Sequence, residues 1–293
     1  MMKKIKIICF GEVLWDMLPT GKLPGGAPMN VAYHLNALGV STDIISRVGK
    51  DDLGAELLDF LTKKHIPVDL IQHDAMYSTG VVNVELDEQG SPSYQIERPV
   101  AWDNILLTNA LLKIVADADA IVYGSLVCRN EASQNTLFEL LKIAKRKIFD
   151  VNIREPFYEQ LLIEHLMSEA QIVKMNEHEL ELISGWYNNE KDFSKQMHFL
   201  QKRFDLETLI VSQGSVGAYC LENNQLFFQK SFKIIVKDTI GSGDAFLAGF
   251  LSEKMHGKSP EECLITACKA GAYVATQAGA TPNMNKEVLA VIG

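Results

Sequence analysis

The sequence has little of what marks secreted, membrane-spanning or metal-holding proteins. Its 293 residues include five scattered cysteines, an odd number that fits reduced thiols and no disulfide framework. Neither these cysteines nor the seven histidines form a metal-site pattern. No apolar stretch is long enough to cross a bilayer, and the short apolar run near the start is interrupted by Lys6. We therefore expect a cytoplasmic protein without disulfides, zinc or a catalytic histidine.

An excess of positive charge is also missing. The net charge is -9 at pH 7, and nucleic acids and anionic membranes favour clustered Lys and Arg, so neither is an expected partner. The Walker A pattern of many nucleotide-binding proteins is absent. A hydrophobic content of 47% with 22% charged residues is typical of a soluble protein with a substantial core, either one large α/β domain or two small ones.

The most informative segment that is present is Asp238-Thr-Ile-Gly-Ser-Gly-Asp244, a glycine-rich turn followed by apolar residues at helical spacing. The spacing places the turn at a helix N-terminus. The backbone N–H groups of Gly241, Ser242 and Gly243 would then point outward without partners, where phosphate oxygens bind readily. Asp244 would accept the proton of a hydroxyl group that attacks a bound phosphoryl group.

Two other interpretations of this turn stay open. A Gly-Ser-Gly-Asp sequence is also ordinary helix capping, in which Ser or Asp supplies the cap. A dinucleotide-binding turn of an NAD-dependent oxidoreductase is disfavoured, because Phe246 stands where that fingerprint needs its third small residue.

From about residue 106 onward, short β-rich runs alternate with helical ones, which is typical of βαβ units around a mainly parallel sheet. Helical periodicity covers residues 131–145 and 156–170. The predicted strands end in polar or small residues, and ligands bind outside the carboxyl ends of such strands, so we expect these residues to line one crevice. The predicted strands are 120–124, 147–152, 171–176 and 208–214.

A small additional sheet is predicted from two other segments. Residues 81–90 and 93–97 alternate apolar and polar side chains around a turn at 88–90, which predicts a hairpin. Residues 14–18 are expected to join this hairpin in a sheet that covers a site as a lid. An edge hairpin of the large sheet is the alternative.

Two amide-bearing segments suggest ligand contacts. The Gly25-Gly26 pair allows the backbone to approach a ligand closely. Pro28 suits a first helical turn, so Asn30 lies near a helix start. From there its side-chain amide can bind paired sugar hydroxyls. Asn176 ends a strand and Glu179 begins a helix, an arrangement that can orient Mg²⁺ through its waters. Ordinary roles at a helix start, as a cap or as a dipole-favoured acid, are the alternatives for both segments.

These motifs occur together in the order of one family, and over essentially its full length the chain resembles the PfkB/ribokinase-type carbohydrate kinases. Gly25-Gly26 with Asn30 is similar to the first family signature, and residues 238–244 are similar to the second, more specific one. Residues 11–19 and 150–154 resemble bacterial fructokinases most, although Val151 stands where those enzymes usually have proline.

The resemblance implies a single domain over residues 1–293, with a ribokinase-like three-layer αβα core, a mainly parallel central sheet and a β-sheet lid formed by insertions near 12–24 and 78–102. It implies phosphorylation of a sugar hydroxyl by ATP with Mg²⁺, and K⁺ in many relatives. Fructose is the expected substrate. Alternatives are 2-keto-3-deoxygluconate, ribose or a nucleoside, or a non-catalytic sugar-binding protein on the same fold. A homodimer through the lid is a further expectation.

By position, the resemblance also implies residue roles. Asp244 is implied as the base, with the anion hole at Gly241, Ser242 and Gly243, although alanine is commoner than serine in the family. Implied sugar contacts are Asp16, Gly26 and Asn30, with Arg98 and Arg154 as candidates for sugar or phosphate. Implied phosphate, Mg²⁺ and nucleotide residues are Asn176, Glu179, Ser212, Gly214 and Gly217. Implied K⁺ ligands are Asp238, the carbonyls of Ile240, Val274, Gln277 and Gly279, and Asn283.

Overall fold

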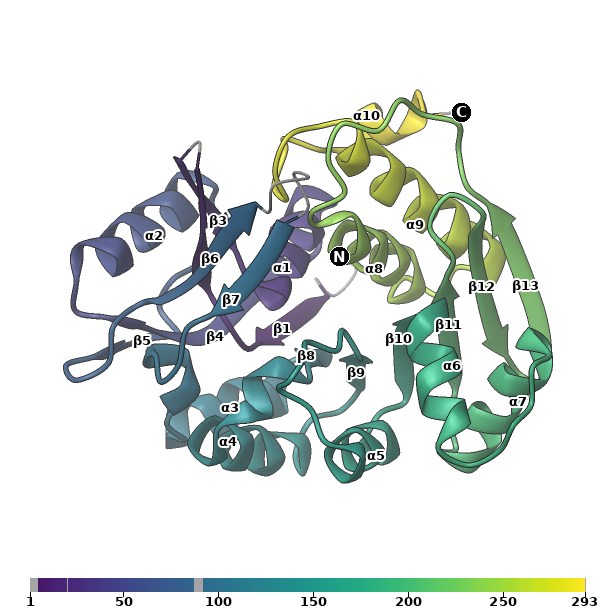
Figure 1. The fold of residues 1–293 in the computed structure, drawn as a ribbon, viewed down its shortest axis with the longest axis horizontal. Coiled ribbons are helices and arrows are strands. Elements are labelled where there is room, and N and C mark those ends of the chain that lie inside the picture. The colour runs from purple at the N-terminus through teal and green to yellow at the C-terminus, as the bar shows by residue number, and fades with distance from the viewer. Residues whose placement is uncertain (1–4, 20, 87–91, 293) are drawn as a thin grey trace.

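The computed structural model describes residues 5–19, 21–86 and 92–292. A nine-stranded sheet forms the centre of the molecule, in the order β13-β12-β11-β10-β9-β8-β1-β4-β5 (Figure 1). Its neighbouring strands are parallel except at β11–β12 and β12–β13. The predicted α/β class with a mainly parallel sheet is therefore confirmed. The strands are β1 (Lys6–Phe10), β4 (Ser41–Gly49), β5 (Ile71–Asp74), β8 (Ala120–Gly124), β9 (Lys147–Asp150), β10 (Ile172–Asn176), β11 (Thr208–Ser212), β12 (Gly217–Glu222) and β13 (Gln225–Lys230).

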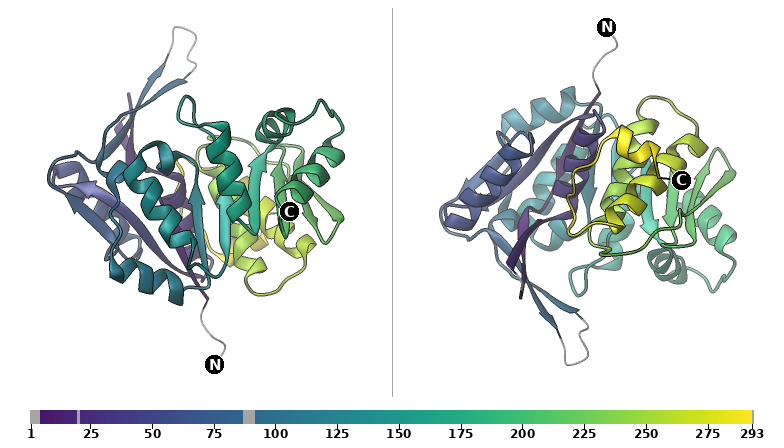
Figure 2. Two further views of the ribbon diagram at one scale, coloured as in Figure 1. Left: turned by 90° about the horizontal axis from the view of Figure 1, so that it is seen from below. Right: turned by 90° about the horizontal axis from the view of Figure 1, so that it is seen from above.

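Helices cover both faces of this sheet, which gives three layers (Figures 1 and 2). Strand β1 shows why: Ile7 and Cys9 pack into one apolar cluster, and Ile8 and Phe10 pack into the other. A strand that is buried on both faces has no polar side, as expected for a parallel sheet. The first layer holds α1 (Ala27–Ala37), α2 (Asp52–Lys63), α8 (Ser242–Lys254) and α9 (Pro260–Ala275), with α10 (Lys286–Ala290) packed on α9. The second holds α3 (Asn109–Asp117), α4 (Glu131–Leu141), α5 (Gln160–Glu169), α6 (Glu177–Gly185) and α7 (Phe193–Arg203).

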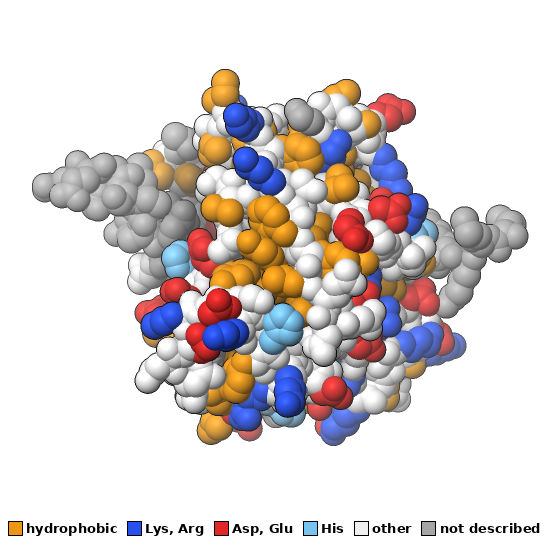
Figure 3. Space-filling view, turned by 90° about the vertical axis from the view of Figure 1, so that its right-hand side faces the viewer, with side chains coloured by type: hydrophobic (Ala, Val, Ile, Leu, Met, Phe, Trp, Pro, Cys, Tyr) orange, Lys and Arg blue, Asp and Glu red, His pale blue; other side chains and the backbone are white. Residues whose placement is uncertain are grey.

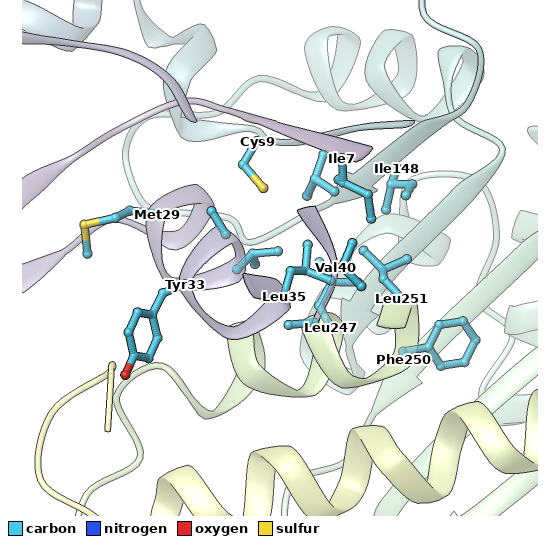
Figure 4. Packing of buried hydrophobic residues seen from close by; sticks show 14 of the residues in the cluster. Ile7, Cys9, Met29, Tyr33, Leu35, Val40, Ile148, Leu247, Phe250 and Leu251 are labelled. Atoms are coloured by element: carbon cyan, nitrogen blue, oxygen red, sulfur yellow. The ribbon is translucent and has the colours of Figure 1, made fainter. Parts of the chain in front are cut away.

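Helices α1 and α8 pack against each other on the sheet. Figure 4 shows Leu35 of α1 beside Leu247 of α8, below Ile7 of β1, and all three are fully buried. A close-packed contact of this kind holds the two helices in one relative position. The first turns of α1 and α8 are therefore held near each other by the core.

Three of the predicted elements end earlier or begin later than their periodicity suggests. The helix predicted from residue 156 begins at Gln160, because a turn comes first, in which the Phe157 N–H donates to the Arg154 carbonyl at 2.7 Å. The strand predicted to reach residue 152 ends at Asp150, and Asn152 has a left-handed φ of 38° that a strand cannot contain. The helix predicted to reach residue 145 ends at Leu141.

A second sheet of four strands, in the order β3-β2-β6-β7, lies apart from the large one (Figure 2). β6 and β7 pair antiparallel, which confirms the predicted hairpin, although its turn at 88–90 lies outside the described residues. β2 joins β6 in parallel, and the Trp15 indole N–H donates to the Leu53 carbonyl at 2.9 Å. The hairpin is thus no edge of the large sheet. The four strands are β2 (Leu14–Leu18), β3 (Gly21–Gly25), β6 (Gly80–Leu86) and β7 (Pro92–Ile96).

The surface and the cysteines add little to the assignment of function. Figure 3 shows hydrophobic side chains gathered near the middle of the face that forms the right-hand side of Figure 1. All five cysteines are buried free thiols. Within the described ranges, the helices are too short or too polar to span a membrane.

Candidate active site

A cavity of about 480 Å³ lies between the large sheet, the first turns of α1 and α8, and the second sheet. Its floor is polar and its cover from the second sheet and nearby segments is apolar, an arrangement typical of sites that bind small polar ligands. Eight of the predicted site residues come together in it, Ile240 among them. The other seven are Asp16, Gly26, Asn30, Arg154, Gly241, Gly243 and Asp244. The apolar cover is formed by Leu14, Val82, Ile96 and Leu126.

The N-terminus of α8 supplies amide groups to this cavity. Gly241 is the N-cap residue with a left-handed φ of 74°, and a Cβ added there would lie 2.5 Å from the Ala280 Cβ, so only glycine fits. Among the described residues, the N–H groups of Gly241, Gly243 and Asp244 have no hydrogen-bond acceptor. Ser242 corrects the prediction, because its N–H donates to the Thr239 carbonyl at 3.2 Å and closes the turn. The unpaired amides therefore come from the two glycines and Asp244.

Asp244 lies in the first turn of α8, beside Asn30 of α1. The Asn30 amide donates a hydrogen bond to the Asp244 carboxylate at 2.8 Å. Burial raises the pKa of Asp244 to about 6, the negative charge of Asp150 adds to this effect, and Asn30, Lys174 and Arg154 oppose it. A carboxylate with this pKa is mostly ionised at neutral pH and is a better base than an ordinary aspartate.

A second acid of the floor, Glu12, was not among the predicted site residues. Burial raises the pKa of Glu12 to about 7. Its Oε1 accepts from the Ala27 N–H at 3.3 Å, and its Oε2 has no partner within the described part of the chain. Gly26 has a φ of 113°, and a Cβ there would lie 2.4 Å from the Glu12 carbonyl oxygen. Glu12 thus holds the glycine turn at the start of α1. Its place as an acid within an apolar stretch was the sequence signal that could have identified it.

A third acid, Asp16, comes from the second sheet. It lies on β2 opposite Leu23 of β3 and lines the cavity. Burial raises the pKa of Asp16 to about 6, and the positive charge of Arg154 opposes this shift. Arg154 lines the same cavity, so a cation and several acids share one small space.

Lys174 is a further residue of the floor that the sequence analysis did not identify. It lines the cavity and pairs with Asp150, at 3.0 Å between Nζ and Oδ1. A lysine at the centre of a strand whose other residues are apolar up to the terminal Asn176 was the signal that could have found it.

Arg98 lies elsewhere. Its exposed side chain stands over the Phe157 ring, 5.8 Å from the centroid, and lines a separate cavity of about 430 Å³ with Arg129 and Tyr158. A sugar contact by Arg98 is not supported by this position.

Asn176 and Glu179 form the N-terminal capping box of α6. The Asn176 Oδ1 accepts from the Glu179 N–H at 2.9 Å, and the Glu179 carboxylate accepts from the N–H groups of Asn176 and Ile153, both at 2.8 Å. Both carboxylate oxygens are thus engaged by the backbone, which fits the helix-start alternative and does not fit direct ligation of Mg²⁺. The part of the chain that the structure describes contains no group of three or more His, Cys, Asp or Glu side chains that could hold a metal ion.

The residues implied for the nucleotide lie at the same edge of the sheet but outside the cavity. Ser212 ends β11 and is the register partner of Asn176 at the end of β10. Gly214, with a φ of 51°, lies in the turn that follows, and Gly217, with a φ of 141°, is the first residue of β12. This edge continues the cavity floor along the strand ends, as the crevice rule predicts.

The residues implied for K⁺ are only partly brought together. The Asp238 carboxylate accepts from the N–H groups of Ile240 and Gly279, both at 3.0 Å, so these three residues adjoin. The Val274 carbonyl accepts from the Gln277 N–H at 2.9 Å. The Asn283 Oδ1 accepts from the Lys64 ammonium at 3.0 Å, which already places a cation on that oxygen. Asn283 therefore does not fit as an ion ligand in this geometry.

Over nearly its whole length the chain is similar to proteins that are already known. The pfkB family carbohydrate kinase model matches residues 6–287. The chain is 30% identical to a fructokinase of Klebsiella pneumoniae over 298 residues, which covers 94% of each chain. The crystal structure of a Xylella fastidiosa fructokinase with bound ATP matches with a TM-score of 0.87 at 24% identity, over 99% of this chain and 98% of that one. A Vibrio cholerae fructokinase variant with fructose, ADP and a potassium ion matches with a TM-score of 0.84 at 23% identity, over 99% and 98%.

The two structural matches concern the fold, whereas the family model and the Klebsiella relative concern the sequence over nearly its whole length. Taken with the acid and the unpaired amides at the N-terminus of α8, they lead to one conclusion. The chain belongs to the pfkB family of carbohydrate kinases and is an ATP-dependent sugar kinase.

Proposed function

We propose that this protein is a fructokinase, which transfers the γ-phosphate of ATP to D-fructose and releases fructose 6-phosphate and ADP. The observation that carries the proposal is the position of Asp244: its carboxylate lies in one cavity with the unpaired N–H groups of Gly241 and Gly243. A base and an anion-binding turn at one place suit attack of a hydroxyl group on a phosphoryl group.

In this proposal Asp244 accepts the hydroxyl proton, and the anion hole binds the transferring phosphoryl group. Asp16 and Asn30 bind sugar hydroxyls; the Asn30 Oδ1, which has no partner among the described residues, is free to accept from one of them. Arg154 is a further contact for the sugar. Phosphoryl transfer has a loose transition state, so positioning and charge stabilisation account for most of the rate and a strong base is not needed.

Closure of the second sheet over the cavity would exclude water during transfer. The apolar side chains of Leu14, Val82 and Ile96 on three of its strands support this role, because they line the cavity from that side.

Mg²⁺ bound with ATP would neutralise charge on the phosphate oxygens. Asn176 and Glu179 match the family's Mg²⁺ motif. Their side chains already bond backbone N–H groups, so their proposed contact with the ion is through water. For K⁺, the adjoining Asp238, Ile240 and Gly279 are the residues that could contribute oxygen ligands.

The test is release of ADP from Mg·ATP across a panel of fructose, ribose, 2-keto-3-deoxygluconate, glucose and adenosine. A value of kcat/KM at least tenfold higher for fructose than for any other member, with fructose 6-phosphate identified by NMR, is the expected result. Higher turnover of another member would move the assignment to that substrate. Binding of a sugar without ADP release from any member would instead support the non-catalytic alternative.

A further inference from the structure

Lys174 is the charged residue in the middle of β10, where the other residues are apolar except Asn176 at the strand end. Along β10, Val173 and Met175 pack in the layer of α5, α6 and α7, and Ile172 packs in the layer of α8 and α9. Lys174 faces the same way as Ile172, because side chains alternate along a strand. Only 6% of the residue is exposed. A buried ammonium is costly unless it has partners, so this lysine needs a specific use.

Its partner is Asp150, at the end of the adjacent strand. β9 and β10 are in parallel register with Lys174 opposite Asp150, and Nζ donates to Oδ1 at 3.0 Å. A carboxylate at this distance favours the charged form of the lysine, so the pair is an ammonium and a carboxylate. Asp150 Oδ2 has no partner within the described residues. The Asp150 carboxylate therefore holds the Lys174 ammonium through Oδ1 alone.

The other side of the ammonium faces the turn that begins α8. A Cβ added to Gly243 would lie 3.4 Å from the Lys174 Nζ, and both residues line the cavity that holds Asp244. Within the described residues, Asp150 is the only hydrogen-bond acceptor of the ammonium. An ammonium has three N–H donors, so two are available to a ligand beside Gly243.

We propose that Lys174 is a catalytic residue that contacts the transferring phosphoryl group, and that Asp150 is its positioning residue. The inference rests on the proposed kinase function. During transfer, the bond from the γ-phosphorus to ADP breaks, the bond to the sugar oxygen forms, and the hydroxyl proton goes to Asp244. Lys174 keeps its protons. Its charge and the N–H groups of Gly241 and Gly243 stabilise the phosphoryl oxygens from two sides.

The test compares Lys174→Met, the double variant K174M/D150N and the control Lys147→Met with the wild type. Lys147 is matched because it lies at the start of β9, pairs with Glu169 at 2.7 Å and does not line the cavity. We expect K174M to lower kcat by about 10²- to 10³-fold, the effect of removing one preorganised stabilising group. Sugar affinity without nucleotide, measured by calorimetry, should change by less than about threefold, since the lost contact is made to phosphate.

The double variant separates lost catalysis from lost folding, because it removes both charges of the buried Lys174–Asp150 pair and so leaves neither partner alone. A native circular dichroism spectrum with the same loss of kcat supports the proposal. Asp150→Asn alone should also move the acid limb of the pH profile to lower pH, because Asp150 raises the pKa of Asp244. A kcat for K174M or the double variant within about threefold of K147M overturns the proposal, as does a K174M effect confined to sugar affinity. A wild type inactive on every sugar instead overturns the fructokinase assignment and this inference with it.

Discussion

The side-chain amide of Asn30 donates to the carboxylate of Asp244 at 2.8 Å, across 214 positions of the chain. This bond joins the first turn of α1 to the first turn of α8, and the packing of Leu35 on Leu247 holds the two helices together (Figure 4). It also fixes which way the amide points: its N–H group faces Asp244, and its oxygen, which has no partner among the described residues, is left for a ligand. The two motifs are therefore joined by a direct side-chain contact.

Replacing Asp244 by asparagine removes the proposed base but keeps the shape of the side chain. We expect kcat to fall by about 10²- to 10⁴-fold, the range for loss of a general base, while sugar affinity in calorimetry changes little. Asp59→Asn on α2 is a suitable control, because Asp59 is a surface residue paired with Lys63. Activity of the Asp244 variant near that of the control would remove Asp244 from this role.

Asn30→Ala should change the pH dependence as well as sugar affinity. The hydrogen bond from Asn30 lowers the pKa of Asp244, so its loss raises that pKa further above the usual value. The acid limb of kcat/KM, which reports the free enzyme, should therefore move to higher pH. Asn36→Ala on the same helix is the control, since within the described residues the Asn36 side chain donates only to the His65 carbonyl. An unmoved acid limb would show that the Asn30 bond does not set the basicity of Asp244.

Glu12→Gln should make stability less dependent on pH. Burial raises the pKa of Glu12 from 4.5 to about 7, so the folded protein holds a proton that the unfolded chain releases between these values. The resulting stabilisation is complete below about pH 4.5 and is lost as pH rises through about 7, on the order of 3 kcal/mol in all. In urea unfolding, the variant should gain on the wild type by up to this amount between pH 5 and 8. The surface variant Glu139→Gln should show no such gain.

Gly241→Ala tests the anion hole by its shape. The new Cβ would lie 2.5 Å from the Ala280 Cβ at a φ of 74°, so the turn must move. We expect a loss of about 2 to 4 kcal/mol in unfolding free energy and a fall in kcat that exceeds the fall in sugar affinity. Gly257 has the same φ of 74°, and a Cβ added there would meet no described residue within 4 Å, so Gly257→Ala measures the backbone strain alone. Equal stability and activity in the two variants would contradict the close packing inferred at Gly241.

Local features were predictable wherever neighbours along the chain decide them. The buried strands, the glycine turn before α8 and the place of Asn30 in a first helical turn all follow from periodicity and from the limits on glycine and proline. The placement of Asp244 at a helix start follows in the same way. The family could be predicted from the order of these motifs along the chain.

Side-chain partners were decided by the tertiary structure. The pairing of Lys174 with Asp150 depends on the register of β10 on β9, and the engagement of Glu179 by the Ile153 N–H depends on a neighbouring strand end. Tertiary packing also brings Asn283 to Lys64, 219 positions away in the chain. It likewise places Arg98 at a separate cavity. Periodicity tells which face of an element is buried, whereas the group that a buried side chain meets depends on how distant elements pack. The sequence by itself therefore determined the family, the elements and the acid at the helix start, and only the packing decided which charges share the cavity with it.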